Sequence, residues 1–199
     1  MSGNTVLHLA AMDGTEDVVQ FLLDKGADKR VLGYRNRIPF LSALWASRDL
    51  NIIKLLYEDV SDLTARDDKG DTALHLATAG SAIIVAAFLL DKGADRKALD
   101  NRHLTPFGLA ILNHRQLGMI KLLFRDESDL TFADQNAAIN YANSDVLNYL
   151  ALKISSSSPF YSRLRNRLLN EQAELFPGKR TKGPVSKIRE KIDRNSGRG

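Results

Sequence analysis

Four histidines are the side chains of this sequence best suited to acid–base chemistry near neutral pH. His8 and His75 stand at the same place in two copies of a Thr-x-Leu-His motif. His103 and His114 have no serine or aspartate at the spacing of a catalytic motif. Cysteine is absent, so neither thiolate catalysis nor a disulfide is available. The histidines therefore favour a structural role over a catalytic one.

Motifs for metal, phosphate and acyl-transfer chemistry are also missing. The sequence contains no H-E-x-x-H, no G-x-S-x-G and no Walker-type glycine loop. Acidic pairs such as Asp67-Asp68 and Asp126-Glu127 are typical of solvated turns, and no spacing pairs them across a cleft. We therefore predict a protein that is not an enzyme and that uses neither a metal nor a cofactor.

The elements that carry these residues are repeated along the chain. Residues 52–64 read IIKLLYEDVSDLT, and residues 119–131 read MIKLLFRDESDLT, sixty-seven positions later. The same shift places FLLDKGADKRVL at 21–32 on FLLDKGADRKAL at 88–99. About half of the residues from 3 to 67 recur in this register. A fixed spacing of this kind predicts a repeat architecture.

A shorter period lies within the long one. An apolar pattern begins at Thr5 and recurs from Ile38, Thr72 and Thr105, at intervals of 33, 34 and 33 residues. The threonines provide a side-chain acceptor for the unpaired N–H groups of a helix start. Proline follows two of these positions, where its fixed φ suits the first helical turn. Each unit is thus predicted to begin with a short helix.

A second apolar stretch in each unit also has helical spacing. In the first unit it runs from Val18 to Leu23, and Gly26 then supplies a left-handed residue that ends the helix. Neither short helix buries its face alone, so neighbouring units have to stack. The two copies of the thirteen-residue stretch are predicted to be outer packing helices, with Lys54 and Lys121 facing solvent.

The sequence GDTALHLA…FLLDKGAD at 70–95 resembles the ankyrin repeat, in which a T-P-L-H-x-A helix start precedes a second helix and a G-A-D turn. The resemblance covers residues 3 to about 133 in four repeats, and a shortened fifth repeat follows over 136–154. It implies an all-α, helix-turn-helix solenoid with turn fingers. It also implies that His8 and His75 hydrogen-bond neighbouring loops.

The predicted domain boundaries follow from these units. We expect an ankyrin repeat domain over 1–154 and a basic C-terminal tail over 155–199. The units are about 1–32, 33–66, 67–99 and 100–133, with a shortened cap over 134–154. The second and fourth units have VSD and ESD where Gly-Ala-Asp would stand, so we expect altered turns there without a change of fold.

The resemblance also implies a binding face. In ankyrin-like arrays the inner helices and the turns between repeats form a concave surface, on which the variable residues contact a partner protein. Trp and Arg are frequent at such interface hot spots. The alternative for Trp45 is that it packs onto its neighbours as extra core. The predicted partner-binding residues are Met12, Tyr34, Arg35, Arg37, Trp45, Lys69, Arg102 and Leu112.

The tail differs from the repeats in charge. Residues 1–154 carry 17 Lys/Arg against 20 Asp/Glu, whereas residues 155–199 carry 11 against 4. A helix is predicted over 159–176 and disorder beyond it, where GKRTK at 178–182 is a weak nuclear-import or polyanion patch. The helix either docks over the last half-repeat or binds a partner or an anionic surface. Its apolar stripe comprises Phe160, Tyr161, Leu164, Leu168 and Leu175.

Two functional classes fit this sequence. The first is a non-enzymatic, monomeric scaffold that binds another protein through the concave face. The second is a localising adaptor, similar to effectors that intracellular bacteria send into host cells, whose basic tail contacts a nucleus, a membrane surface or a nucleic acid. No run of eighteen apolar residues and no secretory leader is present, so we expect a cytoplasmic protein, or one acting in a host cell or a nucleus.

Overall fold

The computed structural model describes residues 3–114 and 117–175, which form α-helices and two short 3-10 helices without any strand. The elements are α1 (Val6–Asp13), α2 (Glu16–Asp24), η1 (Tyr34–Asn36), α3 (Pro39–Trp45), α4 (Leu50–Leu56), α5 (Val60–Thr64), α6 (Ala73–Ala79), α7 (Ile83–Asp91), α8 (Pro106–Leu112), α9 (Leu117–Leu123), η2 (Glu127–Asp129), α10 (Phe132–Tyr141), α11 (Ser144–Lys153) and α12 (Pro159–Leu175). The predicted all-α fold is confirmed for this part of the chain.

Threonine and proline start the first helix of most repeats, as the sequence predicts. The side-chain oxygen of Thr5 accepts a hydrogen bond from the backbone N–H of His8 in α1. Thr105 caps α8 in the same way. Pro39 and Pro106 occupy the first turns of α3 and α8, where no backbone donor is lost from the helix.

Glycine ends the second helix of the first and third repeats. Gly26 and Gly93 have φ values of 81° and 95°, in the left-handed region that favours glycine. After Gly26, the backbone N–H of Ala27 donates to the carbonyl of Leu22 at 3.0 Å, which closes the last turn of α2. The chain can therefore reverse direction at these two points without strain.

The second and fourth repeats turn differently, as VSD and ESD predict. Asp59 caps the extra helix α5, and its Oδ1 accepts from the N–H of Ser61 at 2.7 Å. Asp126 caps η2, and its Oδ1 accepts from the N–H of Ser128 at 2.8 Å. An aspartate-capped turn thus replaces the glycine turn in alternate repeats.

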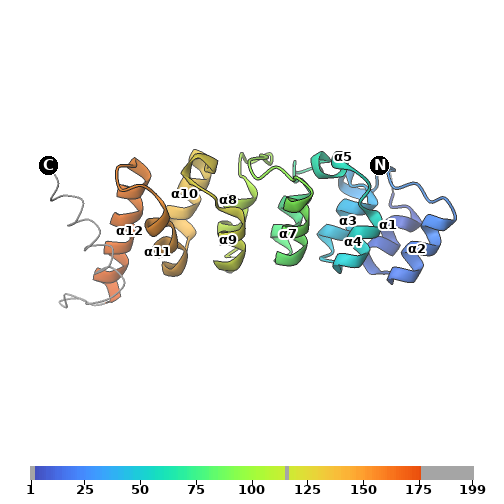
Figure 1. The fold of residues 1–199 in the computed structure, drawn as a ribbon, viewed down its shortest axis with the longest axis horizontal. Helices are drawn as coiled ribbons and strands as arrows, with labels where there is room; N and C mark the ends of the chain where they lie inside the picture. The colour runs from blue at the N-terminus through green and yellow to red at the C-terminus, as the bar shows by residue number, and fades with distance from the viewer. Residues whose placement is uncertain (1–2, 115–116, 176–199) are drawn as a thin grey trace.

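The helices stack in two rows. The first helices α1, α3, α6, α8 and α10 contact one another in chain order, and so do the second helices α2, α4, α7, α9 and α11. Figure 1 shows these pairs side by side, with the N-terminus at one end and α12 at the other. Matched positions of the inner row, Leu7, Phe40, Leu74 and Phe107, are at most 3% exposed. One apolar core therefore runs along the whole stack.

The outer helices serve packing, as predicted for the repeated stretch. Ile53 in α4 and Ile120 in α9 are fully buried between layers. Lys54 and Lys121, their neighbours in the sequence, are exposed. Truncation of one such large core residue is expected to lower the free energy of unfolding by about 2–5 kcal/mol.

Helix α12 covers the C-terminal end of the stack. It contacts α10 and α11, and its apolar residues Phe160, Tyr161, Leu164 and Leu168 are buried in the common core. The side chain of Leu175, the last residue of the predicted stripe, and the predicted disordered stretch from 177 onward lie outside the described residues. Within the described residues, this part of the tail is a docked helix.

Candidate protein-binding face

Three loops between repeats share one backbone geometry. In each, the first residue donates its N–H to the carbonyl of the residue four positions later. These bonds are Gly33 to Arg37 (2.8 Å) in loop 1 (33–37), Asp67 to Asp71 (3.1 Å) in loop 2 (67–71) and Asp100 to Leu104 (3.0 Å) in loop 3 (100–104). The side chains between these ends therefore project from matched positions in successive repeats.

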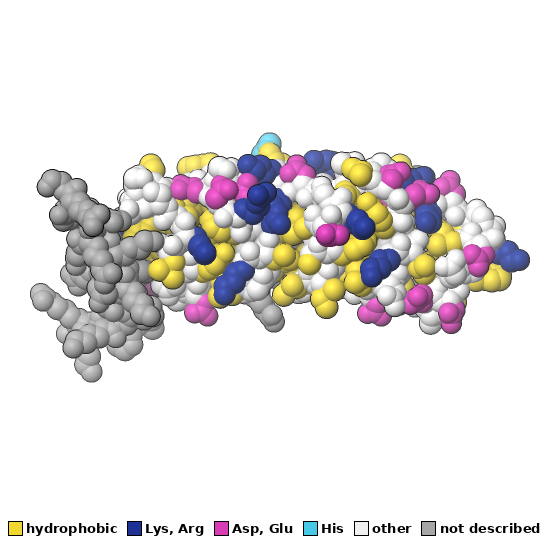
Figure 2. Space-filling view, viewed as in Figure 1, with side chains coloured by type: hydrophobic (Ala, Val, Ile, Leu, Met, Phe, Trp, Pro, Cys, Tyr) yellow, Lys and Arg dark blue, Asp and Glu magenta, His cyan; other side chains and the backbone are white. Residues whose placement is uncertain are grey.

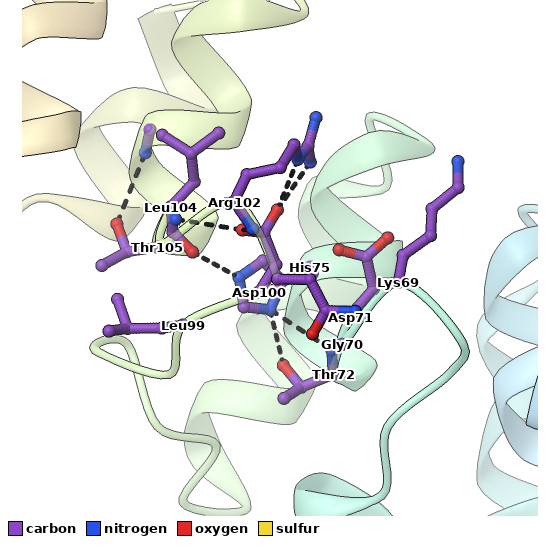
Figure 3. A network of polar contacts seen from close by, with 12 residues as sticks. Lys69, Gly70, Asp71, Thr72, His75, Leu99, Asp100, Arg102, Leu104 and Thr105 are labelled. Atoms are coloured by element: carbon purple, nitrogen blue, oxygen red, sulfur yellow. Dashed lines mark hydrogen bonds and ion pairs between the residues drawn. The ribbon is translucent and has the colours of Figure 1, made fainter.

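Aspartate side chains hold loops 2 and 3 in this shape. Oδ1 of Asp67 accepts from the backbone N–H groups two and four residues later, at 2.9 and 3.0 Å. Oδ1 of Asp100 does the same at 2.8 and 3.0 Å, and Figure 3 shows the bonds of loop 3. The sequence interpretation of Asp67 as a solvated turn residue was wrong, because Asp67 is 4% exposed, and Asp100 was missed. The signal was an aspartate five positions before the capping Thr72 and Thr105.

The loops are also bonded to one another through their backbones. The N–H of Asp68 donates to the carbonyl of Arg35 at 2.9 Å, which joins loop 2 to loop 1. The N–H of Asn101 donates to the carbonyl of Lys69 at 3.0 Å, which joins loop 3 to loop 2. The three loops consequently form one continuous edge along the inner helices.

His8 joins the first repeat to the second, and His75 joins the third repeat to the fourth. Nδ1 of His75 accepts from the backbone N–H of Thr72 at 3.3 Å, so the proton lies on Nε2, which donates to the carbonyl of Leu104 at 3.1 Å. His8 makes the matching bonds to Thr5 and to the carbonyl of Arg37. Burial lowers the pKa of His75 and keeps its ring neutral. Both ring nitrogens of each histidine are thus occupied, and the Nε2 bond to the next loop is the role that the resemblance implies.

The other two junctions use charged residues in place of histidine. Nη2 of Arg37 pairs with Oδ2 of Asp67 at 2.8 Å, and both side chains are almost fully buried. At the last junction, Asp134 accepts from the backbone N–H and the hydroxyl of Thr105 at 3.2 and 3.0 Å. Gly108 leaves the space for this carboxylate, because a Cβ there would lie 2.0 Å from Oδ1 of Asp134.

The predicted partner-binding residues differ in accessibility. Tyr34 and Trp45 are 57% and 54% exposed, although both are large and apolar. The remaining residues divide into Lys69 and Arg102, which are exposed, Met12, Arg35 and Leu112, which are half-buried, and Arg37, which is buried. Most of the set is therefore accessible to a partner, and Arg37 is the exception.

Arg37 is placed to orient Trp45. Its guanidinium carbon lies 4.9 Å from the centroid of the Trp45 ring, while the same group pairs with Asp67. In loop 1, the guanidinium of Arg35 lies 5.5 Å from the ring centroid of Tyr34. The structure thus brings two cation–aromatic pairs to the loop 1 and α3 region. Met12 and Leu112 stand near the C-terminal ends of α1 and α8, as Trp45 does in α3.

The last residue of loop 2 is a third aspartate, and one oxygen of its side chain has no hydrogen bond. Asp71 is 7% exposed, and its Oδ1 has no hydrogen-bond partner. Burial, and then the nearby charges of Asp67 and Asp100, raise the pKa of Asp71 to about 6. Figure 3 shows Asp71 beside Lys69 in loop 2. This carboxyl group changes charge state within the mildly acidic range.

Other kinds of site are not formed by the described part of the chain. No group of three or more His, Asp or Glu side chains among those residues is arranged to hold a metal ion. Within the same residues, no helix is long enough and apolar enough to span a bilayer. Figure 2 shows apolar and charged side chains intermixed over one face of the stack.

Two family models match this sequence. The model for three copies of the ankyrin repeat matches residues 40–134, and the single ankyrin repeat model matches residues 2–34. The chain belongs to the ankyrin repeat family. Ankyrin repeats generally mediate protein–protein interaction, and the family is generally non-enzymatic.

The relatives that this chain matches are mostly much longer than the chain itself. E3 ubiquitin-protein ligase KEG of Arabidopsis thaliana is 37% identical over 83 residues, 41% of this chain and 5% of that protein. Ankyrin repeat and KH domain-containing protein mask-1 of Caenorhabditis elegans is 29% identical over 143 residues, 68% and 5% of the two chains. The putative ankyrin repeat protein FPV031 of Fowlpox virus is 29% identical over 136 residues, 66% and 39%. The chain therefore spans well under half of each of these relatives.

Proposed function

We propose that this ankyrin chain is a protein-binding scaffold that holds a partner against its inner helices and loops 1–3, the concave face of the predicted stack. One observation carries the proposal. Trp45 is 54% exposed at the end of an otherwise buried helix, beside a row of loops fixed by backbone hydrogen bonds. A large aromatic side chain held in place on a rigid surface is typical of an interface hot spot.

The charges around Trp45 support a partner with an apolar anchor and acidic edges. Lys69 and Arg102 are exposed on loops 2 and 3, and Arg35 stacks on the exposed ring of Tyr34 in loop 1. Cations at the edge of an interface chiefly raise the association rate and select against partners of the same charge. The proposed partner segment therefore presents an apolar side chain to Trp45 and carboxylates to the loops.

The proposed scaffold performs no catalysis and uses no cofactor or metal. His8 and His75 support this, since both ring nitrogens of each are hydrogen-bonded: Nδ1 to the capping threonine of the same repeat, and Nε2 to a backbone carbonyl of the next repeat. A base that abstracts a proton needs a nitrogen within reach of the substrate. We propose that the chain acts as a monomer, because one stack presents the whole row of loops.

The test combines capture of the partner with one substitution. After a pull-down and mass spectrometry identify a partner, Trp45→Ala is expected to weaken binding by about 2 kcal/mol or more, roughly thirtyfold, in calorimetric titrations. Its Tm should fall by only a few degrees, because the Trp45 ring is half exposed and its cation–π contact with the buried Arg37 contributes roughly 0.5–2 kcal/mol. Ile84→Ala is the control, since Ile84 is 71% exposed on the outer helix α7 and should leave affinity unchanged. An early-melting Trp45→Ala protein whose folded fraction binds normally would place the site elsewhere.

The adaptor function is the second proposal, and the charge of the tail supports it. Residues 155–199 carry 11 Lys/Arg against 4 Asp/Glu, an excess suited to a nucleic acid or an anionic membrane. Because α12 is part of the core, the informative truncation ends at residue 175 rather than 154. The adaptor predicts that residues 1–175 keep partner affinity but lose binding to anionic vesicles or RNA, and lose nuclear or host-cell targeting of a fluorescent fusion. If residues 1–175 and the full chain bind and localise alike, the adaptor proposal is wrong and only the scaffold proposal remains.

A further inference from the structure

A pocket of about 530 Å³ lies beside α2 and α4, two neighbouring helices of the outer row. It is lined by Gln20, Leu23 and Asp24 of α2, by residues 27–30 in the turn that follows, and by Leu55 and Glu58 at the end of α4. We call it the outer pocket. Its three carboxylates, on Asp24, Asp28 and Glu58, belong to exposed residues, so a side chain can enter from solvent.

The internal duplication provides a matched comparison for this pocket. The aspartate of each G-A-D turn accepts from the backbone N–H two residues later, at 2.7 Å in the first copy and 2.8 Å in the second. Arg30 pairs with Asp62 at 2.6 Å, and its counterpart Lys97 pairs with Asp129 at 2.9 Å. The first and second copies of this junction are therefore built alike.

In the second copy, an arginine binds the end of the neighbouring outer helix. Nη1 of Arg96 donates to the carbonyls of Leu122 and Leu123, the last two residues of α9. The last carbonyls of a helix have no partner within the helix, so a cationic side chain is well suited to bind them.

In the first copy, the matching carbonyls lack this donor. The counterpart of Arg96 is Lys29, which lines the outer pocket and makes no hydrogen bond or ion pair with the described residues. No described side chain donates to the carbonyls of Leu55 and Leu56 at the end of α4. The outer pocket therefore adjoins two acceptors that an arginine occupies in the second copy.

Charge also favours a cation in the first copy. Glu58 has the exposed Arg125 as its counterpart. Burial, and then the charge of Arg125, lower the pKa of Arg96, so Arg125 disfavours the cation beside it. Oε2 of Glu58 pairs with Arg30 at 2.9 Å, and its Oε1 has no partner among the described residues. A cation that entered the outer pocket would thus meet a carboxylate where Arg96 meets a like charge.

The outer pocket is not a surface on which a preceding repeat would stack. Ala87, Asp91 and Asp95 are the counterparts of three of its lining residues in the second copy. All three are exposed, although α4 of the preceding repeat packs against α7 there. The pocket therefore belongs to the junction between the first two repeats, both of which the chain contains.

We propose that the outer pocket binds an arginine side chain of another protein, whose guanidinium donates to the carbonyls of Leu55 and Leu56 as that of Arg96 does in the second copy. A guanidinium has five donors in one plane, so it can also reach Glu58, whereas a lysine amine places its donors at one point. The outer pocket lies on the outer row and loops 1–3 follow the inner row, so this site does not depend on the proposed concave face.

The first experiment uses a short peptide with a single arginine. Acetyl-Gly-Arg-Gly-amide is titrated into the natural chain while the amide signals of Asp28 and Tyr57 are followed by NMR. We expect saturable shifts with a Kd on the order of millimolar, and binding about threefold weaker or less for the lysine analogue. Lys29→Arg should remove the shifts, because the new side chain itself reaches the carbonyls at the end of α4. Lys54→Arg makes the same change on the exposed side of α4 and is the matched control, which should leave the shifts unchanged.

Four results of this titration would overturn the proposal. They are the absence of saturable shifts, equal effects of Lys29→Arg and Lys54→Arg, a lysine peptide that binds as well as the arginine peptide, and tighter binding of free arginine than of the peptide. Trp45→Ala should not alter the shifts, so failure of this site and failure of the concave face are distinguishable.

The second experiment tests the contact on which the comparison rests. In thermal unfolding without peptide, Arg96→Lys should lower the Tm by roughly 2 °C or more, and Lys29→Arg should raise it by a similar amount. An unchanged Tm for Arg96→Lys would mean that the arginine contact contributes nothing, and it would overturn the proposal. A Lys29→Arg chain that melts later but still gives the peptide shifts would overturn it as well, because the peptide would then bind elsewhere.

Discussion

Replacing Asp71 with asparagine should stabilise this protein at neutral pH. The Asp71 side chain is 7% exposed, its Oδ1 has no hydrogen-bond partner, and Asp67 and Asp100 lie nearby. Burial and these two charges raise the pKa of Asp71 from its ordinary value of 3.8 to about 6. Asparagine has nearly the same shape, and it removes the charge that the site disfavours.

The size of the effect follows from the shift in pKa. A shift of about two pKa units corresponds to roughly 3 kcal/mol between the charged and the neutral carboxyl group. Between pH 3.8 and 6 the folded chain binds more protons at this site than the unfolded chain does, so the free energy of unfolding falls as the pH rises. Above pH 6 the loss is complete. The Asp71→Asn gain should therefore be near zero at pH 4 and approach 3 kcal/mol at pH 7.5.

Urea unfolding followed by circular dichroism at several pH values measures this dependence. The control is Asp68→Asn, which removes an exposed charge from the same loop and should change the free energy of unfolding by less than about 0.5 kcal/mol. The reasoning fails if Asp71→Asn destabilises the chain at pH 7.5. It also fails if the gain is the same at pH 5 and pH 7.5, because a constant gain does not come from titration of Asp71.

The remaining predictions concern the junctions between repeats. His75→Ala should lower the free energy of unfolding by about 1–3 kcal/mol in urea titrations, because the carbonyl of Leu104 loses its buried donor. A hydrolase or transferase activity that His75→Ala abolishes in a folded protein would contradict the structural role. Gly108→Ala should also destabilise the chain, since the new Cβ would displace the Asp134 carboxylate from Thr105. In the Gly108→Ala background, Asp134→Ala should lower the free energy of unfolding by less than it does in the natural chain. Additive losses in this double-mutant cycle would show that the two positions are independent.

The order and type of the helices could be predicted from the sequence because local signals agree with the fold. Threonine and proline mark the helix starts, and Gly26 and Gly93 mark two helix ends with positive φ. The repeat fixes which side chains are equivalent, so the buried positions of one unit predict those of the next. The altered turns at VSD and ESD were accessible for the same reason.

The environment of individual charged residues could not be predicted in this way. Arg37 occupies a turn in the sequence, where an exposed partner contact is the natural interpretation, but it is buried against Asp67 thirty residues away. The pairing depends on how loops 1 and 2 approach one another, and a period within one unit carries no information about that approach. The unpaired oxygen of Asp71 depends on the same loop positions.

Leu9 and Leu76 show a second limit of sequence reasoning. They are the same residue in the same motif, yet one is 51% exposed and the other is 2% exposed. A repeat pattern reports which face of a helix stacks, but it does not report whether that face is covered in a given repeat. This difference in exposure is visible only when the two copies are compared within the folded chain.

The polar contacts between repeats explain how the proposed binding residues can vary while the fold stays the same. The four junctions use three kinds of side-chain contact, namely a histidine at His8 and His75, the Arg37–Asp67 pair, and Asp134. The bonds between successive loops join backbone groups, so they do not depend on the side chains that project from those loops. Such an edge is already ordered before a partner arrives, which reduces the conformational entropy lost on binding. Lys69 joins loop 3 to loop 2 through its backbone carbonyl and not through its side chain, so we expect substitutions of that side chain to alter what the proposed scaffold binds without altering how it folds.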